Sequence, residues 1–216
     1  YYQGRIIENI RISNTVDAYA VNGWESMKLE NHSGIVDNYR FPKGDPEVMA
    51  RYNAPLYLAV KMNRKVVSTG DTTLVDTYIV NEKNLKGSYI LNLVAKDESG
   101  NVVASHKERV TVKGGNDYGQ CLQSGWAFIP KSKGYTRIEA SLLKGKTELV
   151  KGDDLLFAVE LNTKGITTRG SVADTTGALV NFLRGVGMEV PVYKGGTPEG
   201  DYLLVGAYEP TQWGSG

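Results

Sequence analysis

The chain has 216 residues, of which 41% are hydrophobic, so it is long enough to bury a substantial core. Its 25 basic and 24 acidic residues nearly cancel, and the formal net charge of +1 excludes a global positive field that would attract nucleic acid or an acidic membrane. The single cysteine, Cys121, excludes an internal disulfide. No apolar run is long enough to span a bilayer.

Residues 1–53 predict a connection that leads into the segment beginning at residue 54. The isoleucines between residues 6 and 12 fit a helix or a strand equally well. Residues 17–25 predict a strand, and residues 30–47 are polar and rich in turn formers. Pro46 ends a run of prolines and glycine that indicates an irregular connection into the next segment.

Residues 54–162 predict an immunoglobulin-like β-sandwich. Apolar residues alternate with polar ones in short runs, and turn formers separate the runs. About seven or eight strands over roughly 100 residues is the size and rhythm of that fold. The expected strands cover residues 56–62, 74–80, 89–95, 102–104, 109–112, 121–129, 135–143 and 155–161. The expected core contains Leu58, Val60, Leu91, Leu93, Val110, Ile138 and Ala140.

One tyrosine of this segment has a structural and a functional interpretation. Tyr135 follows Gly134 and begins an alternating strand, which is the position of a tyrosine corner. In such a corner the buried hydroxyl donates a hydrogen bond to the backbone. We prefer this structural role.

Residues 163–216 differ in character and predict a partial α/β segment. The apolar residues of its middle part lie on one side of an expected helix that ends at Gly187. In chain order, the expected elements are a strand at 166–172, a helix at 175–186, and strands at 188–193 and 202–206.

The glycines and paired carboxylates of the chain do not predict a catalytic motif. Gly195, Gly196 and Gly200 precede neither a Lys-Ser or Lys-Thr pair nor a helix, so they do not indicate a phosphate-binding loop. Asp153 and Asp154 are adjacent, and adjacent strand residues face opposite sides, so the two carboxylates cannot flank one glycosidic bond. We interpret them as turn residues that precede a strand.

Metal sites and cofactors are not expected. The chain has two histidines and one cysteine, which do not form the clusters that bind zinc. His106 precedes Lys107 and Glu108, and we expect its side chain to be solvated. Asp45 and Glu47 flank Pro46, so we assign both to the connection rather than to a catalytic pair.

The aromatic residues favour rings that carry a polar group. The chain has 13 tyrosines and 3 tryptophans against 4 phenylalanines, and such rings stack on the faces of sugars. Tyrosine is also common in β-sheets for packing reasons alone, which is our interpretation of most of the 13.

Two stretches of the sequence carry a resemblance to a known family. Gly-Trp-Glu-Ser at 23–26 and Lys-Leu-Glu-Asn-His-Ser-Gly-Ile-Val-Asp-Asn-Tyr-Arg-Phe-Pro-Lys-Gly-Asp-Pro at 28–46 resemble the exit from the catalytic barrel of glycoside hydrolase family 2. Asn-Ala-Pro-Leu-Tyr-Leu-Ala-Val-Lys at 53–61 and Gly-Asp-Thr-Thr-Leu-Val-Asp-Thr-Tyr-Ile-Val-Asn at 70–81 resemble the immunoglobulin-like domain that follows that barrel. The resemblance covers residues 17–162.

The resemblance implies a larger β-galactosidase-like glycosidase in which this chain is an accessory region. It implies that residues 1–53 are the end of the barrel and the connection and that residues 54–162 are the sandwich. The partial α/β segment at 163–216 matches the family only weakly. It places Trp24 where the family has an aromatic platform beneath the sugar, although a core tryptophan fits equally well. It gives no catalytic residue here, because the two catalytic glutamates of the family lie on earlier barrel strands.

We therefore expect a chain that is inactive alone and that meets carbohydrate through its parent enzyme. The expected partners are the upstream catalytic barrel and carbohydrate, with no nucleic acid, no membrane span, no metal and no cofactor. The expected location is extracytoplasmic, either periplasmic or secreted. The alternative is a stand-alone sandwich that binds carbohydrate itself or acts as a structural spacer.

Overall fold

The structure, a computed structural model, describes residues 2–16, 18–20, 35–160, 169–198 and 200–206. The chain divides into two compact units, Tyr1–Val159 and Glu160–Gly216. The sequence placed this boundary after residue 162, and it drew residues 1–53 as a part separate from the sandwich.

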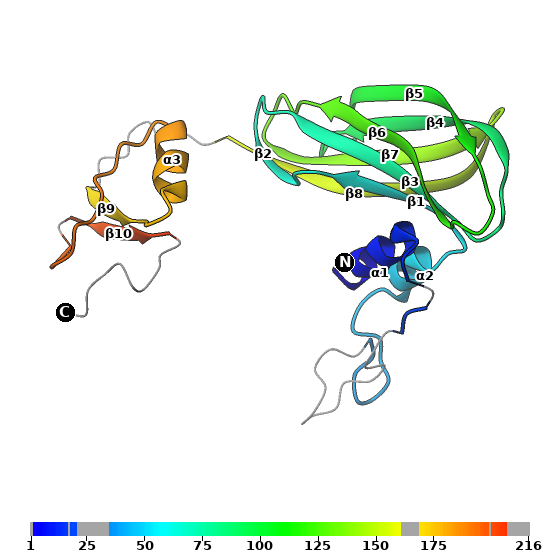
Figure 1. The fold of residues 1–216 in the computed structure, drawn as a ribbon, viewed down its shortest axis with the longest axis horizontal. Helices are drawn as coiled ribbons and strands as arrows, with labels where there is room; N and C mark the ends of the chain where they lie inside the picture. The colour runs from blue at the N-terminus through cyan, green and yellow to red at the C-terminus, as the bar shows by residue number, and fades with distance from the viewer. Residues whose placement is uncertain (1, 17, 21–34, 161–168, 199, 207–216) are drawn as a thin grey trace. The chain divides into compact units, whose positions relative to one another are not determined.

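The first unit contains a sandwich of two sheets (Figure 1). The smaller sheet has the order β1-β3-β6, and the larger has the order β2-β8-β7-β4-β5. The strands are β1 (Leu56–Met62), β2 (Val66–Ser68), β3 (Thr73–Asn81), β4 (Gly87–Lys96), β5 (Val102–Val112), β6 (Gly119–Phe128), β7 (Gly134–Lys144) and β8 (Thr147–Val159).

The strand order is that of an immunoglobulin-like sandwich, as the sequence predicts. The smaller sheet takes the first, third and sixth strands, and β4, β5, β7 and β8 form most of the larger one. Neighbouring strands are antiparallel except for β2, which pairs parallel with β8. The predicted fold class, a mainly β sandwich with a partial α/β segment, is confirmed.

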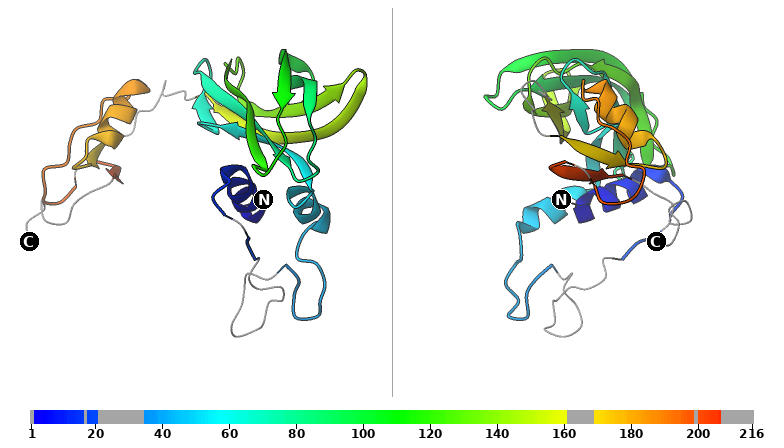
Figure 2. Two further views of the ribbon diagram at one scale, coloured as in Figure 1. Left: turned by 45° about the vertical axis from the view of Figure 1, so that its right-hand side comes forward. Right: turned by 90° about the vertical axis from the view of Figure 1, so that its left-hand side faces the viewer.

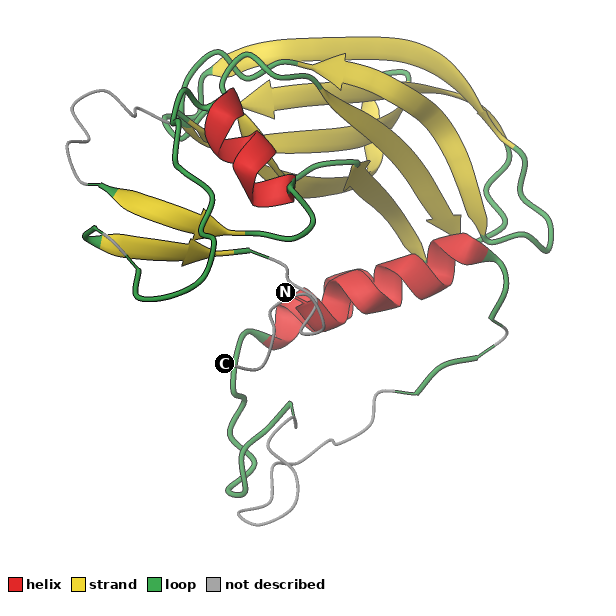
Figure 3. Cartoon of the chain, turned by 60° about the vertical axis from the view of Figure 1, so that its left-hand side comes forward, coloured by secondary structure: helices red, strands yellow, loops and turns green. Residues whose placement is uncertain are grey.

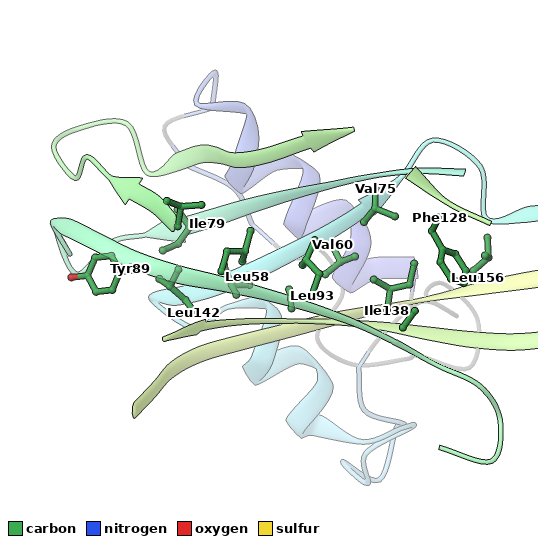
Figure 4. Close-up of a cluster of buried hydrophobic side chains, with 14 of the residues drawn as sticks. Leu58, Val60, Val75, Ile79, Tyr89, Leu93, Phe128, Ile138, Leu142 and Leu156 are labelled. Atoms are coloured by element: carbon green, nitrogen blue, oxygen red, sulfur yellow. The ribbon is translucent and has the colours of Figure 1, made fainter. Parts of the chain in front are cut away.

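The core lies between the two sheets (Figure 4). Alternate residues of each strand point inward. In β7 the inward residues are Thr136, Ile138, Ala140 and Leu142. All seven residues of the predicted core are in this buried cluster: Leu58, Val60, Leu91, Leu93, Val110, Ile138 and Ala140. In β3 the inward residues are Val75, Thr77 and Ile79. The alternate residues of this strand, Leu74, Asp76, Tyr78 and Val80, face away from the core.

The two sheets meet closely where β8 crosses β1. A Cβ atom added at Gly152 would lie 1.8 Å from the carbonyl oxygen of Leu58, which is backbone and cannot yield. Only glycine allows this approach. The contact closes the edge of the sandwich at which the helices of the first unit also pack.

Two helices cover the outer face of the smaller sheet (Figure 2). Helix α1 (Tyr2–Ser13) and helix α2 (Pro46–Tyr52) contribute Ile7 and Tyr52 to a second buried cluster. Their partners there come from β1 and β3, and Tyr57, Ala59 and Val80 are the buried ones. Strand β1 is therefore buried on both faces, and α1 lies against the sandwich in every view (Figure 3).

Helix α2 corrects the prediction of an irregular connection. Pro46 is at the start of the helix, where its missing N–H costs nothing, and the side chain of Asp45 accepts a hydrogen bond from the backbone N–H of Glu47. Asp-Pro-Glu is thus a helix-start signal at this position. The isoleucines of residues 6–12 belong to a helix, which settles the alternative that the sequence left open.

Two strand predictions need correction. Strand β8 begins at Thr147, so Asp153 and Asp154 lie inside a strand and not in a turn. The strands expected at 102–104 and 109–112 are one strand, β5. The strand expected at 17–25 lies mostly outside the described residues, and residues 18–20 form no strand.

The second unit contains a short parallel sheet and one helix. Strand β9 (Gly170–Ala173) pairs parallel with β10 (Tyr202–Val205), and a single parallel bridge joins Val172 to Val192. The strand expected at 188–193 is reduced to that bridge. The unit therefore has the parallel pairing of an α/β segment, as predicted.

The helix of this unit, α3 (Ala178–Gly185), ends where the sequence predicts. Gly187 has a φ of 79°, and its N–H donates to the carbonyl of Arg184, while the N–H of Met188 donates to the carbonyl of Leu183. This pair of bonds is a Schellman motif, which requires the left-handed conformation that glycine adopts easily. In the described part of the chain, no helix has the length and apolar character to cross a bilayer.

The core assignment predicts a large loss of stability for Leu93→Ala. Leu93 has no exposed surface, so the substitution removes buried methyl groups and leaves a cavity that costs about 2–5 kcal/mol. Leu74→Ala is the matched control, because Leu74 lies on β3 and is 43% exposed; it should cost less than about 1 kcal/mol. Urea unfolding measures both, and an unchanged midpoint for Leu93→Ala would contradict the assignment.

Candidate functional site

The residue that the resemblance marks for substrate, Trp24, lies outside the described residues. The site is therefore built from the charged groups that the structure places together. They form two clusters on either side of β8, one buried and one at the surface.

The buried cluster has Arg5 of α1 at its centre. Its guanidinium forms an ion pair with Glu8 at 2.8 Å, between Nη1 and Oε1, and a second ion pair with Asp154. It also donates to the carbonyl of Val60 at 3.3 Å and to the carbonyl of Asp153 at 3.1 Å. One arginine thus bonds to its own helix, to β1 and to β8.

Both carboxylates of this cluster are completely buried and have further partners. The hydroxyl of Tyr57 donates to Oε2 of Glu8 at 2.7 Å, and Nζ of Lys61 lies 3.2 Å from Oε1. Nζ of Lys65 lies 2.5 Å from Oδ2 of Asp154. A buried carboxylate is tolerated only when charges and hydrogen bonds replace its lost hydration, and these contacts supply them.

The cluster has electrostatic consequences for Arg5 and Tyr57. Burial opposes the charge of Arg5, but the carboxylates of Glu8 and Asp154 more than offset this, so the pKa of Arg5 is raised. Burial raises the pKa of the Tyr57 hydroxyl, and the charge of Glu8, which also accepts its hydrogen bond, raises the pKa further. Arg5 stays charged and Tyr57 stays neutral at physiological pH.

Two more side chains attach α1 to the sandwich. Arg11 donates to the carbonyl of Tyr52 at 2.5 Å and pairs with Glu82 at 2.6 Å. The side-chain amide of Asn14 donates to the carbonyl of Gly119 at 2.6 Å and accepts from its N–H at 2.7 Å, as a neighbouring strand would. A Cβ atom at Gly119 would lie 2.5 Å from backbone of α1, so the helix end and β6 are in direct contact.

The surface cluster lies on the outer face of the larger sheet. Asp153 accepts from Arg51 of α2 at 2.8 Å through Oδ1 and from Arg137 of β7 at 2.5 Å through Oδ2. Both oxygens of Asp153 are therefore held by guanidinium groups. A pocket of about 400 Å³ opens beside them and is also lined by Asn92 and Ser141.

Asp153 and Asp154 face opposite sides of β8, which confirms the argument against a catalytic pair. Asp154 points into the buried cluster, and Asp153 points to the surface. The sequence did not reveal the partner of either residue, because Arg5, Arg51 and Arg137 are far away along the chain.

One other side-chain prediction is wrong. Tyr135 is 53% exposed, and its ring packs on Phe157, so it is not a buried tyrosine corner. Side chains alternate along a strand, and the inward residues of β7 have even numbers, so Tyr135 points outward. The side chain of His106 is 36% exposed to solvent, and its ring stacks on Trp126 with 6.1 Å between ring centroids.

The described residues contain no group of three or more histidine, cysteine or acidic side chains that could hold a metal ion. Cys121 is exposed and free. The charged clusters can hold the fold together or contact a polar ligand.

Comparison with known proteins finds only distant structural likenesses. No family model matches the sequence, and no curated protein matches it. A glycosyl hydrolase family 2 member from Bacteroides cellulosilyticus is 15% identical over 54% of this chain and 16% of that chain, with a TM-score of 0.38. The beta-glucuronidase of Bacteroides uniformis is 17% identical over 47% of this chain and 13% of that chain, with a TM-score of 0.37.

A third solved structure is not described as a glycosidase. The CARDB domain of a Pyrococcus furiosus protein, in complex with metal ions, is 15% identical over 48% of this chain and 87% of that domain, with a TM-score of 0.33. This chain spans less than a fifth of either Bacteroides protein. Likenesses at this level indicate no function.

The buried cluster predicts that Arg5→Leu is strongly destabilising. The substitution leaves Glu8 and Asp154 buried beside fewer positive charges, and breaking a buried ion pair on one side costs about 3–5 kcal/mol. Arg64→Leu is the matched control, because its pairing with Asp71 at 3.7 Å is at the surface and should contribute little. Equal unfolding midpoints for the two variants would contradict the structural role of the cluster.

The raised pKa of Tyr57 predicts how Tyr57→Phe responds to pH. The unfolded chain releases the tyrosine proton near pH 10, whereas the folded chain retains it, so the stability from this group is complete below about pH 10 and declines above it. Tyr57→Phe should be less stable than wild type at neutral pH, and the difference in Tm should shrink between about pH 9 and pH 11. Exposed Tyr39→Phe is the control. A constant difference in Tm across that range would contradict this account.

Proposed function

We propose that this chain is a non-catalytic accessory region of a larger glycoside hydrolase of the β-galactosidase-like type. The observation that carries the proposal is the buried cluster around Arg5, which makes the N-terminal segment part of the same unit as the sandwich. The resemblance begins at residue 17, just after α1, and assigns the residues that follow this helix to the exit of a catalytic barrel. A sandwich joined in this way would extend the barrel as a rigid support.

The carboxylates at the centres of the two charged clusters support a non-catalytic role. Retaining hydrolysis of a glycoside needs two carboxyl groups about 5 Å apart, both facing the sugar. Glu8 and Asp154 have no exposed side-chain surface and are already paired with cations. Asp153 is held at both oxygens by Arg51 and Arg137. None of the three is arranged as a proton donor or as a nucleophile.

Exposed apolar side chains in the N-terminal segment support a position inside a larger protein. Ile6 is 58% exposed, although it lies on a helix whose opposite side is buried, and Tyr39 and Phe41 are 76% and 67% exposed. Apolar groups that gather in one segment mark an interaction surface more often than scattered ones do. The upstream barrel is the partner that we propose for them.

The remaining parts of the proposal come from the resemblance. Trp24 would lie beneath the sugar at the cleavage point, and carbohydrate would be bound through the parent enzyme. The protein would work outside the cytoplasm, in the periplasm or as a secreted enzyme. Each of these statements stands or falls with the family assignment.

The test is hydrolysis of aryl β-glycosides. The purified 216-residue chain should give no turnover, whereas a longer protein that includes an upstream barrel should be active, because binding contacts alone do not lower the barrier of the reaction. Inhibitor-sensitive turnover by the 216-residue chain, retained after removal of contaminating glycosidases, would contradict the proposal.

A single substitution in the longer protein tests the role of Trp24. Trp24→Ala should lower kcat/KM with little change in Tm if the ring is a sugar platform. A lower Tm with unchanged kinetics would instead identify a core residue. Trp126→Ala is the comparison for a purely structural effect, because Trp126 packs against the sandwich core.

A further inference from the structure

We propose that the outer face of the larger sheet binds a neutral oligosaccharide, from the polar pocket beside Asp153 to the exposed ring of Tyr135. The inference deepens the proposed function, because it assigns direct sugar contact to the sandwich. It does not require catalysis by this chain or by its parent.

The register of β4, β7 and β8 places the polar side chains in rows. Asn92, Ser141 and Lys151 are opposite one another on the three strands. Two residues further along, Val94, Glu139 and Asp153 form the next row. Residues two apart on a strand share a face, so both rows point outward into the same pocket.

The charge balance of the pocket favours a neutral ligand. Its volume of about 400 Å³ suits a small polar group, and its lining has as many positive as negative side chains. The charged residues of the lining are Arg51, Arg137, Lys151, Glu139, Glu148 and Asp153. A phosphate or a polyanion would gain no net attraction there.

The polar groups of the pocket are partly fixed and partly unused. Asp153 is held by two guanidinium groups, and Glu139 pairs with Lys96 at 2.7 Å. Within the described part of the chain, the amide of Asn92 and the hydroxyl of Ser141 make no hydrogen bond to another residue. The unused groups can donate hydrogen bonds to the hydroxyl groups of a sugar and accept hydrogen bonds from them. The fixed charges beside them keep the pocket polar.

Aromatic rings occupy the same face of the sheet, further along β7. Val66, Phe157 and Tyr135 are opposite one another on β2, β8 and β7. The Tyr135 ring is tilted 52° to that of Phe157 with 4.8 Å between centroids, and Tyr135 is 53% exposed. A ring that is supported on one side and open on the other can contact the apolar face of a sugar.

The two ends of this surface lie on a single strand. Ser141 and Tyr135 are six residues apart on β7, which corresponds to roughly 20 Å. Arg137 lies between them on the same face and also lines the pocket. The surface is therefore long enough for more than one sugar ring, which is why we infer an oligosaccharide.

A protein partner fits this surface less well. The pocket is lined mainly by charged and polar side chains, whereas the core of a protein interface is depleted of charges. Tyr135 and Val66 are exposed apolar groups, but they lie at the end of the surface away from the pocket. The exposed apolar residues of the N-terminal segment are a better candidate for a protein contact.

The experiment is affinity electrophoresis and calorimetry of the full chain with galactomannan, barley β-glucan and arabinogalactan, beside polygalacturonate and heparin as charged probes. We expect binding to at least one neutral polysaccharide and none to the charged ones. Tyr135→Ala and the double variant Asn92→Ala/Ser141→Ala should each weaken binding about tenfold, with Tm unchanged. Tyr118→Ala is the control, because Tyr118 is 51% exposed and outside this face.

Three results with the 216-residue chain alone would overturn the inference. They are no binding to any neutral probe, binding that both variants retain in full, and binding to the charged probes alone. Loss of binding in a longer protein that includes the barrel would also overturn it, because the face would then be covered by protein. Hydrolysis is measured separately, so turnover by the 216-residue chain would contradict the accessory role and leave the binding result intact.

Discussion

The completely buried carboxylate of Glu8 is the constraint on which the rest of the first unit depends. An unpaired carboxylate in that position would cost several kcal/mol, so α1 can dock only where Arg5, Lys61 and Tyr57 meet it. The same arginine reaches Asp154 and the backbone of β1 and β8. Ion pairing therefore sets the position of the helix, and the apolar contacts between α1, α2 and the smaller sheet follow from it.

This arrangement explains why a helix outside the sandwich has the burial of a core element. With α1 and α2 on its outer face, β1 is buried on both sides, and the helices cover the part of the smaller sheet that includes Tyr57, Ala59 and Val80. The larger sheet keeps an open outer face, on which Asp153 is held by Arg51 and Arg137. The sandwich thus has one face joined to the N-terminal segment and another that stays open.

The sandwich could be predicted from the sequence, and the helix attachment could not. Period-two alternation is a local signal, and it placed Leu58, Leu93 and Ile138 in the core correctly. The ion pair between Arg5 and Asp154 joins residues 149 positions apart, and no local pattern contains it. Two local signals were also missed. Asp45 and Pro46 mark the start of α2, and the alternation of side chains along β7 points Tyr135 outward. The surface pocket was unpredictable because it requires the register of three strands and a residue from α2.

The most direct test of the account is hydrogen exchange of the intact chain, measured by mass spectrometry. If the buried cluster joins α1 to the sandwich, the amides of residues 6–13 should open only with the whole unit and exchange at the rate of the slowest β4 and β7 amides. In Arg5→Leu, the helix amides should exchange much faster than those of the strands. Fast exchange of α1 in the wild-type chain, with β4 and β7 still protected, would show that the helix is not part of the folded unit and would contradict the central claim.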